Sequence, residues 1–452
     1  MKYGIIIFLF ILILVIIFHS KPSYAQLTGK EKFSPPEWSK NSVIYEVNTR
    51  QYTPEGTFRA FEKHLPELKK MGIDIIWLMP INPIGVMNRK GSLGSYYAVQ
   101  DYKKVNPEYG TLDDFKHLVT KIHEDGMHVI IDWVANHTAW DNVWVKTHPD
   151  FYNKDSTGSF IPPVADWQDV IDLNYDNKEL WNYMIDAMDY WVKECDIDGF
   201  RCDVAAMVPT EFWVEARTSV SKTKNLFMLA EAGESFIHKA FDMTYNWPLK
   251  DLMNDVASGK KDASEIVKYY KTEKRDFTKS DYRMVFTSNH DINTWDGSVY
   301  ERLGPAAESF AVLCGTVSGM PLIYSGQEAG MNKRLRFFDK DTIEWKPDKM
   351  REIYSTLNHL KIENKALWNG AYGGDQKFLK SNNKNVIGFV REKDDRQVFA
   401  IFNFSAEKQT VEFKNTTLRG KYLNLFNNSD VKEFKGALTF SLEPWQYYVY
   451  TK

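Results

Sequence analysis

Short apolar segments alternate with longer amphipathic ones from about residue 43 to residue 367. The apolar segments are rich in β-branched and aromatic residues, as is typical of buried strands, and they cover residues 44–49, 74–79, 128–134, 198–204, 226–231, 241–247, 283–288 and 321–326. Continuous apolar strands that alternate with helices indicate a parallel sheet that is covered on both faces. Eight such strands predict an α/β fold of the closed (β/α)8 barrel type.

Two of the intervening segments repeat their apolar residues at helical spacing, so that each set shares one face of a helix. The first set is Phe58, Phe61, Leu65 and Leu68, and the second is Leu180, Met184, Met188 and Trp191. We expect each set to lie on one helix that packs against the barrel.

Two further segments depart from this alternation. Residues 138–177, which follow the third strand, contain Trp, Pro, Asp and Gly with little periodicity, and a connection of this length usually has a function. We expect a small lobe beside the mouth of the active site. From residue 367 to residue 452 the pattern predicts an antiparallel β-sandwich, with strands at 386–390, 397–403, 409–413, 422–426, 438–442 and 446–450. The barrel would then occupy residues 26–366.

The N-terminus carries an apolar run at residues 4–18, followed by polar residues. Such a run is short for a bilayer span and is typical of the apolar region of a signal peptide. Ser23 and Ala25 supply the small side chains that a signal peptidase reads. We therefore expect residues 1–25 to be a signal peptide and the mature protein to be exported, without stable membrane association. The alternative is an uncleaved N-terminal anchor.

Charge and cysteine content exclude two classes of protein. Lys and Arg number 57 against 60 Asp and Glu, so the chain has no basic excess with which to bind the phosphates of a nucleic acid. The three cysteines, Cys195, Cys202 and Cys314, are too few for a disulfide framework, and we expect them to be buried apolar residues.

Ionisable residues gather at the C-terminal ends of four predicted strands. The third strand ends in residues 132–137, the fourth in 201–203, the fifth in Glu231 and the seventh in 289–291. Active sites of (β/α)8 barrels lie at this end of the strands, because all eight C-terminal ends meet at one edge. We therefore expect these side chains to share one cavity.

Asp203 and Glu231 are the two carboxylates that suit cleavage of a glycosidic bond. That reaction needs two carboxyl groups in different protonation states, and their adjacent strands suit the short separation of a retaining pair. Arg201 points the same way as Asp203 and is expected to hold it ionised. Glu231, crowded by carboxylates, is expected to have a raised pKa. A single carboxylate at a strand end is more often a helix cap or an ion-pair member, but the agreement of four strand ends favours catalysis.

These motifs resemble the four signature regions of the α-amylase family of glycoside hydrolases. The matching positions are residues 131–137, 199–203, Glu231 and 289–291, with further matches at 97–102, 110–111, 172–174 and 319–328. The resemblance implies that Asp203 is the nucleophile, that Glu231 is the acid/base, and that Asp291 binds and distorts the sugar. It also identifies residues 138–177 as the family's domain B.

The same resemblance implies four substrate-binding residues. Arg201 would orient the nucleophile, His137 and His290 would hold sugar hydroxyls, and Tyr97 would stack beneath the sugar ring. The implied activity is retaining hydrolysis of α-1,4-glucosidic bonds in starch, maltodextrins or related α-glucans, which makes an α-glucan the expected partner.

The family's calcium site is only partly matched. Asn136 and Asp172 correspond to two calcium positions, but Ala206 and Met207 stand where relatives often have Lys and His. Oxygen ligands alone can hold calcium. We therefore expect that no cofactor is required and that calcium binding is possible.

Two groups of alternatives remain open. The same catalytic residues serve cyclomaltodextrinases or neopullulanases, α-glucosidases and transglycosylases of the family. A protein of another class, a non-catalytic membrane-anchored subunit with an amylase-like barrel, would be expected to lack the catalytic carboxylates.

Overall fold

The computed structural model describes residues 33–414 and 416–452. The predicted signal peptide, residues 1–25, lies outside these residues. Within the described ranges, no helix combines the length and the apolar character that a membrane span requires.

Eight parallel strands form a closed barrel. In barrel order they run β1-β10-β9-β8-β7-β6-β3-β2, and each overlaps one of the predicted apolar segments. Their bounds are β1 (Ile44–Val47), β2 (Ile75–Leu78), β3 (His128–Trp133), β6 (Gly199–Cys202), β7 (Phe227–Ala230), β8 (Met243–Tyr245), β9 (Tyr282–Val285) and β10 (Met320–Tyr324). The predicted (β/α)8 barrel is confirmed.

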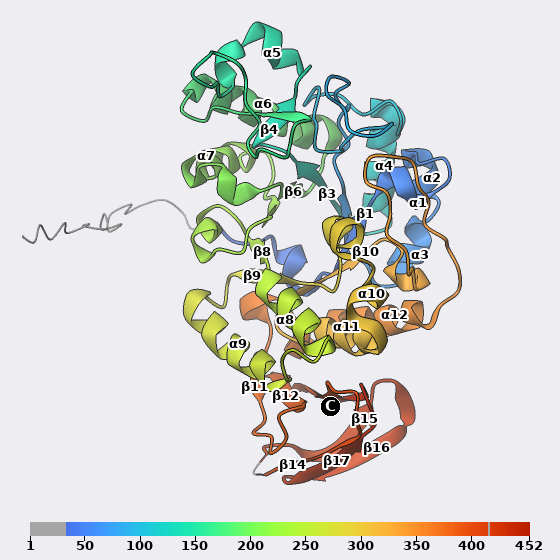
Figure 1. The fold of residues 1–452 in the computed structure, drawn as a ribbon. Coiled ribbons are helices and arrows are strands. Elements are labelled where there is room, and N and C mark those ends of the chain that lie inside the picture. Colours follow the sequence, from blue (N-terminus) through green and yellow to red (C-terminus); the bar gives the residue numbers. More distant parts are fainter. Residues whose placement is uncertain (1–32, 415) are drawn as a thin grey trace, which may run out of the picture. The chain divides into compact units, whose positions relative to one another are not determined.

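Helices cover the outside of the barrel (Figure 1). The longer ones are α4 (Leu112–Glu124), α6 (Lys178–Cys195), α7 (Thr210–Val220), α8 (Trp247–Ala257), α9 (Ser264–Asp276), α11 (Ala307–Thr316) and α12 (Lys349–Glu363). The shorter ones are α1 (Thr49–Tyr52), α2 (Phe58–Glu62), α3 (Leu65–Lys70) and α10 (Val299–Leu303).

The three cysteines are buried and free, as expected.

One of the two helix predictions needs correction. All four residues of the second apolar set lie buried on α6, as predicted. The first set is divided between α2 and α3, although its members are buried. Pro66 lies in the first turn of α3 and has no N–H to donate to the carbonyl of Glu62, so a single helix cannot run through this point.

The insertion after β3 forms a small lobe with its own strand pair. The strands β4 (His137–Ala139) and β5 (Val170–Asp172) pair antiparallel, with His137 opposite Asp172. Between them lies the short helix α5 (Val143–Thr147). Because β4 begins four residues after the end of β3, the lobe is attached directly at the C-terminal edge of the barrel.

The C-terminal part is an antiparallel sandwich, as predicted. A six-stranded sheet has the order β11 (Asp375–Phe378), β12 (Val386–Lys393), β13 (Arg396–Asn403), β18 (Tyr447–Thr451), β15 (Arg419–Asn424) and β16 (Asn427–Lys435). The second sheet pairs β14 (Gln409–Phe413) with β17 (Leu438–Leu442). Phe399 of the first sheet and Phe413 and Phe440 of the second belong to one apolar core.

The strands β11 and β16 were not predicted from the sequence. Both are edge strands of the six-stranded sheet, and most of their residues are polar. Edge strands are commonly protected by polar and charged side chains, which removes the alternating apolar pattern by which strands are recognised.

Candidate active site

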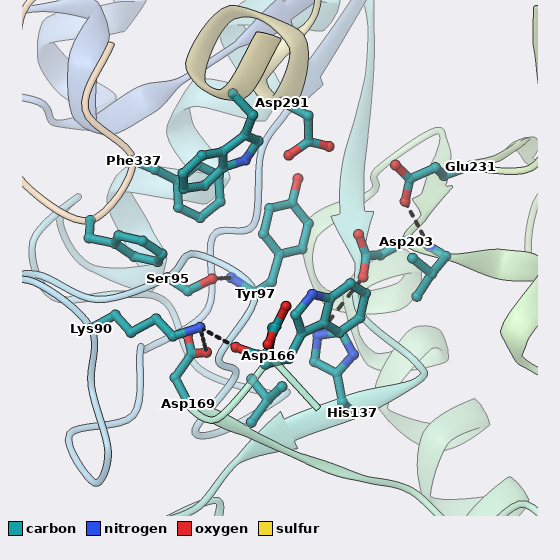
Figure 2. Close-up of a pocket in the computed structure, with 15 residues that line it drawn as sticks. Lys90, Ser95, Tyr97, His137, Asp166, Asp169, Asp203, Glu231, Asp291 and Phe337 are labelled. Atoms are coloured by element: carbon teal, nitrogen blue, oxygen red, sulfur yellow. Dashed lines mark hydrogen bonds and ion pairs between the residues drawn. The ribbon is translucent and has the colours of Figure 1, made fainter. Parts of the chain in front are cut away.

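A pocket of about 770 Å³ opens at the C-terminal ends of the barrel strands (Figure 2). The carboxylates of Asp203, Glu231 and Asp291 line it together with Tyr97 and His137. These five positions come from different connections of the barrel. Four of them lie at strand ends that were predicted to share one cavity, and Tyr97 was implied by the family resemblance. The structure brings them together.

The backbone at Asp203 and Glu231 continues the hydrogen-bonding pattern of the barrel. The amide of Asp203 donates to the carbonyl of Trp133 at 2.9 Å, and the amide of Glu231 donates to the carbonyl of Cys202 at 2.9 Å. The next residue, Val204, has a φ of 36°. This left-handed conformation is strained for a β-branched residue, and strain of this kind is often found at functional sites. The amide of Val204 donates to Glu231 Oε2 at 2.8 Å and orients that carboxyl group.

The buried guanidinium of Arg201 contacts three carboxylates. Its Nη1 donates to Asp132 Oδ1 at 2.8 Å and to Asp203 Oδ1 at 2.9 Å. Its Nη2 forms an ion pair with Glu231 Oε1 at 3.0 Å. The Nε donates to the hydroxyl of Tyr245 at 3.0 Å, which fixes the plane of the guanidinium. Because one planar group touches both Asp203 and Glu231, the two carboxyl groups are held close together at the pocket.

Burial raises the pKa of both carboxyl groups. The pKa of Glu231 is raised to about 7, and burial is a larger cause than the repulsion by Asp203 and Asp291, although Arg201 lowers it. The pKa of Glu231 is thus raised as predicted, but the main cause is burial and not the neighbouring carboxylates. The pKa of Asp203 is raised to about 6, because burial and the neighbouring carboxylates outweigh the effect of Arg201. Arg201 was expected to hold Asp203 ionised; its charge does lower the pKa of Asp203, but it does not offset burial and the neighbouring carboxylates.

His290 lies between two carboxylates. Its Nδ1 is 2.5 Å from Glu46 Oε1, and its Nε2 is 3.2 Å from Asp291 Oδ2 and 2.7 Å from the hydroxyl of Tyr97. Burial lowers the pKa of His290, but Asp291 and Glu46 together raise it well above its usual value. The raised pKa of His290 favours its imidazolium form. Burial raises the pKa of Asp291, but the charge and hydrogen bond of His290, together with Arg201 and Trp295, outweigh it, so the pKa of that carboxyl group is lowered.

His137 and Tyr97 provide neutral groups. Burial lowers the pKa of His137 to about 3, so its imidazole is uncharged at neutral pH, and its Nε2 lies 4.0 Å from Asp203 Oδ2. The hydroxyl of Tyr97 donates to Asp132 Oδ2 at 3.1 Å, and its ring stacks on Phe337 with an interplanar angle of 12°. The Tyr97 ring is thereby held in a fixed orientation at the pocket.

Sequence comparison identifies the family of this barrel. A family model described as the catalytic domain of α-amylase matches residues 40–164 and 160–411. The chain belongs to the α-amylase family. A second model, described as the C-terminal domain of maltogenic amylase, matches residues 376–449.

Members of the α-amylase family with solved structures or curated sequences match this chain over most of its length. The crystal structure of a noncanonic maltogenic α-amylase from Thermotoga neapolitana has a TM-score of 0.85 and 32% sequence identity, and the match covers 92% of this chain and 99% of that chain. Alpha-amylase 3 of Dictyoglomus thermophilum is 24% identical, over 84% of this chain and 87% of its own length. A cyclomaltodextrinase of a Bacillus species is 25% identical, over 84% of this chain and 75% of its own length.

Several residues of this α-amylase family site were not singled out from the sequence. Glu46 lies at the end of β1, so the barrel rule that selected Asp203 could also have selected it. Asp132 was among the residues at the end of the third strand, but no role was assigned to it from the sequence. The other residues that line the pocket lie in the segments that connect the barrel strands to the next helices, where no hydrophobic periodicity marks them. They are Lys90, Ser95, Asp166, Trp167, Asp169, Val170, Val204, Trp295, Phe337 and Phe338.

The two predicted calcium ligands lie at the same end of the β4–β5 pair, where His137 is paired with Asp172. Asn136 precedes β4 and its side chain contacts His137 Nδ1 at 3.3 Å, while Asp172 ends β5 and accepts a hydrogen bond from Asn153 at 2.7 Å. Within residues 33–414 and 416–452, no group of three or more His, Cys, Asp or Glu side chains is arranged to hold a metal ion. The calcium site therefore stays a prediction.

Proposed function

We propose that this glycoside hydrolase cleaves α-1,4-glucosidic bonds in starch, maltodextrins or related α-glucans and retains the anomeric configuration. The observation that carries the proposal is the contact of one guanidinium, Arg201, with both Asp203 and Glu231 in a single pocket. A short separation between the two carboxyl groups suits a retaining mechanism, because it leaves no room for a water molecule between the sugar and a general base.

In the first step, a carboxylate oxygen of Asp203 attacks C1 of the sugar. The bond between C1 and the glycosidic oxygen breaks, and Glu231 gives its proton to that oxygen, which leaves as a hydroxyl group. In the second step, water attacks C1, Glu231 takes a proton from the water, and the ester bond to Asp203 breaks. The raised pKa of Glu231 suits a group that first donates and then accepts a proton near neutral pH.

The neighbouring side chains have separate tasks in this proposal. Asp291 and the imidazolium of His290 form a charged pair that can accept and donate hydrogen bonds to the hydroxyl groups of the reacting sugar. The neutral His137 can bind a further hydroxyl group, and the ring of Tyr97 offers an apolar face to the sugar. Arg201 keeps Asp203 oriented toward C1.

The experiment that tests the proposal is chromatography of the products formed from starch, maltooligosaccharides, pullulan and cyclodextrins. Proton NMR of the first product, recorded before mutarotation, should show the α-anomer. A β-anomer would contradict the assignment of Asp203 as nucleophile, and a lack of cleavage of every α-glucan would contradict the proposed function.

A cyclomaltodextrinase activity is the second candidate, favoured by the similarity to the Bacillus enzyme. It predicts that cyclodextrins are cleaved faster than starch, whereas an α-amylase cleaves starch faster. A non-catalytic subunit is disfavoured, since Asp203, Glu231 and Asp291 are all present and line one pocket. The apolar run at residues 4–18 supports export of the enzyme through a cleaved signal peptide.

A further inference from the structure

An ion pair spans the pocket wall that faces away from Glu231. The Nζ of Lys90 lies 2.9 Å from Asp169 Oδ1 and donates to the carbonyl of Asp166 at 2.9 Å. Figure 2 shows Lys90 and Asp169 on one side of the pocket and Glu231 on the other, with Asp203 between them. Lys90 belongs to the connection between β2 and α4, whereas Asp166 and Asp169 belong to the lobe inserted after β3.

The two segments joined by this ion pair are also held together by packing. A small apolar core includes side chains from both, and its members are Ile84, Ala98, Ala139 and Val170, with Trp167 packed against them. In addition, the amide of Val86 donates to Asp141 Oδ2 at 2.9 Å. The ion pair therefore completes a wall whose two parts are already packed together.

The connection between β10 and α12 extends the same wall. The amide of Leu93 donates to the carbonyl of Phe338 at 2.9 Å, and the amide of Ser92 donates to Asp339 Oδ1 at 2.9 Å. The Nζ of Lys90 lies 5.9 Å from the centre of the Phe338 ring, and Trp295 lies against the same ring. Three chain segments thus meet at Lys90.

The short helices that follow β6 and β7, Ala205–Met207 and Ser235–Lys239, each carry one large exposed apolar side chain. Met207 is 48% exposed and Phe236 is 50% exposed. Exposed apolar side chains at the C-terminal ends of barrel strands are available for contact with an extended ligand.

We infer that the Lys90–Asp169 ion pair closes the donor side of the pocket, so that the enzyme removes short products from the non-reducing end of an α-glucan. The inference rests on the proposed function. Glu231 gives its proton to the leaving group, so the released chain lies on the side of Glu231. The sugar that is transferred to Asp203, and every unit toward the non-reducing end, must lie on the other side. A long chain in that direction would have to pass through the wall that Lys90 and Asp169 complete.

The test uses maltoheptaose and the same oligosaccharide blocked by a 4,6-O-ethylidene group at its non-reducing end. A pocket closed on the donor side has no room for the added group at its end. We expect the wild-type enzyme to cleave the free substrate at least about tenfold faster than the blocked one, which corresponds to about 1.4 kcal/mol in the barrier. In Lys90→Ala and Asp169→Asn the ratio should fall toward one, because the wall is opened.

Lys116→Ala is the matched control. Lys116 forms an ion pair with Glu194 at 3.2 Å on the surface, and its side chain is 37% exposed, compared with 36% for Lys90. It does not line the pocket, so its substrate ratio should equal that of the wild type. Thermal unfolding of each variant shows whether it is folded.

Three results would contradict this inference. Equal rates of the wild-type enzyme on the free and blocked substrates would show that the donor side is open. An unchanged ratio in both folded variants would show that Lys90 and Asp169 do not form the barrier. If the wild-type enzyme cleaved neither substrate, the proposed function itself would fail, and the inference with it.

Discussion

The Nδ1 atom of His290 lies 2.5 Å from Oε1 of Glu46, although 244 residues separate the two along the chain. Both side chains are buried at the barrel edge. The contact leaves Nε2 of His290 directed to Asp291 and Tyr97, so Glu46 determines which nitrogen faces the pocket. Glu46 is therefore a positioning residue that acts through His290.

Glu46→Gln should lower the pKa of His290, since the charge of Glu46 is one of the causes that raise it. A neutral imidazole donates one hydrogen bond where the imidazolium donates two. We expect kcat/KM to fall about 10- to 100-fold, the range of about 1.5–3 kcal/mol for a hydrogen bond to a charged group. The loss should grow as the pH rises, because His290 then loses its proton in the variant. A titration of the histidine side chains by NMR measures the pKa directly.

The control is Glu62→Gln, since Glu62 pairs with His117 at 3.2 Å outside the pocket. This variant should keep the wild-type kcat/KM at every pH. A Glu46→Gln enzyme whose pH profile has the same shape as that of the wild type would contradict a role through His290.

The pKa values of Asp203 and Glu231 predict a narrow pH range of activity. Asp203 must be ionised to attack, so activity should fall as the pH drops below about 6. Glu231 must be protonated to act as an acid, so activity should fall as the pH rises above about 7. The pH profile of kcat/KM, which reports the free enzyme, measures both limits. A profile that stays flat from pH 5 to pH 9 would disprove this assignment.

Glu231→Gln and Asp203→Asn should differ in their response to the leaving group. The amide of Glu231→Gln cannot protonate the glycosidic oxygen, and we expect a loss of about 10²- to 10⁴-fold with maltotriose. With α-maltosyl fluoride the first step should recover, because fluoride leaves without a proton, so fluoride should be released in a burst. The second step should stay slow, because the amide cannot take a proton from water. Asp203→Asn should remain inactive on both substrates, since it lacks the attacking oxygen. Recovery of Asp203→Asn on the fluoride would argue against its role.

Gly199→Ala should destabilise the barrel at the strand that carries Arg201. A Cβ at this position would lie 1.9 Å from the carbonyl oxygen of Phe227, which belongs to the neighbouring strand β7. Forcing the strands apart should lower the free energy of unfolding in urea by about 1–3 kcal/mol. Gly233→Ala is the control, since its nearest atom would be 3.9 Å away. Equal stability of the two variants would contradict this prediction.

Export predicts that the mature chain begins at Gln26. This expectation rests on the apolar run at residues 4–18 and on the small residues Ser23 and Ala25, which a signal peptidase would read. N-terminal sequencing of protein recovered from outside the cytoplasm checks the prediction. A mature protein that retains Met1 would support the membrane-anchor alternative.

The sequence by itself determined the barrel and the position of its catalytic candidates. Eight apolar segments predict eight parallel strands, and the topology of a barrel then brings their C-terminal ends together. For this reason Asp203, Glu231 and Asp291 could be assigned to one cavity before any distance between their side chains was known. The same reasoning could have reached Glu46, since it too stands at the end of a barrel strand.

Only the tertiary structure decided how these groups are charged and how the pocket is enclosed. The pKa of Asp203 depends on the balance between its burial and the charge of Arg201, and burial is a property of the packed barrel. The contact of Lys90 with Asp169 joins two irregular segments whose positions no hydrophobic period encodes. Periodic patterns specify which face of a strand or helix is buried, whereas contacts between distant loops arise only when the chain has packed.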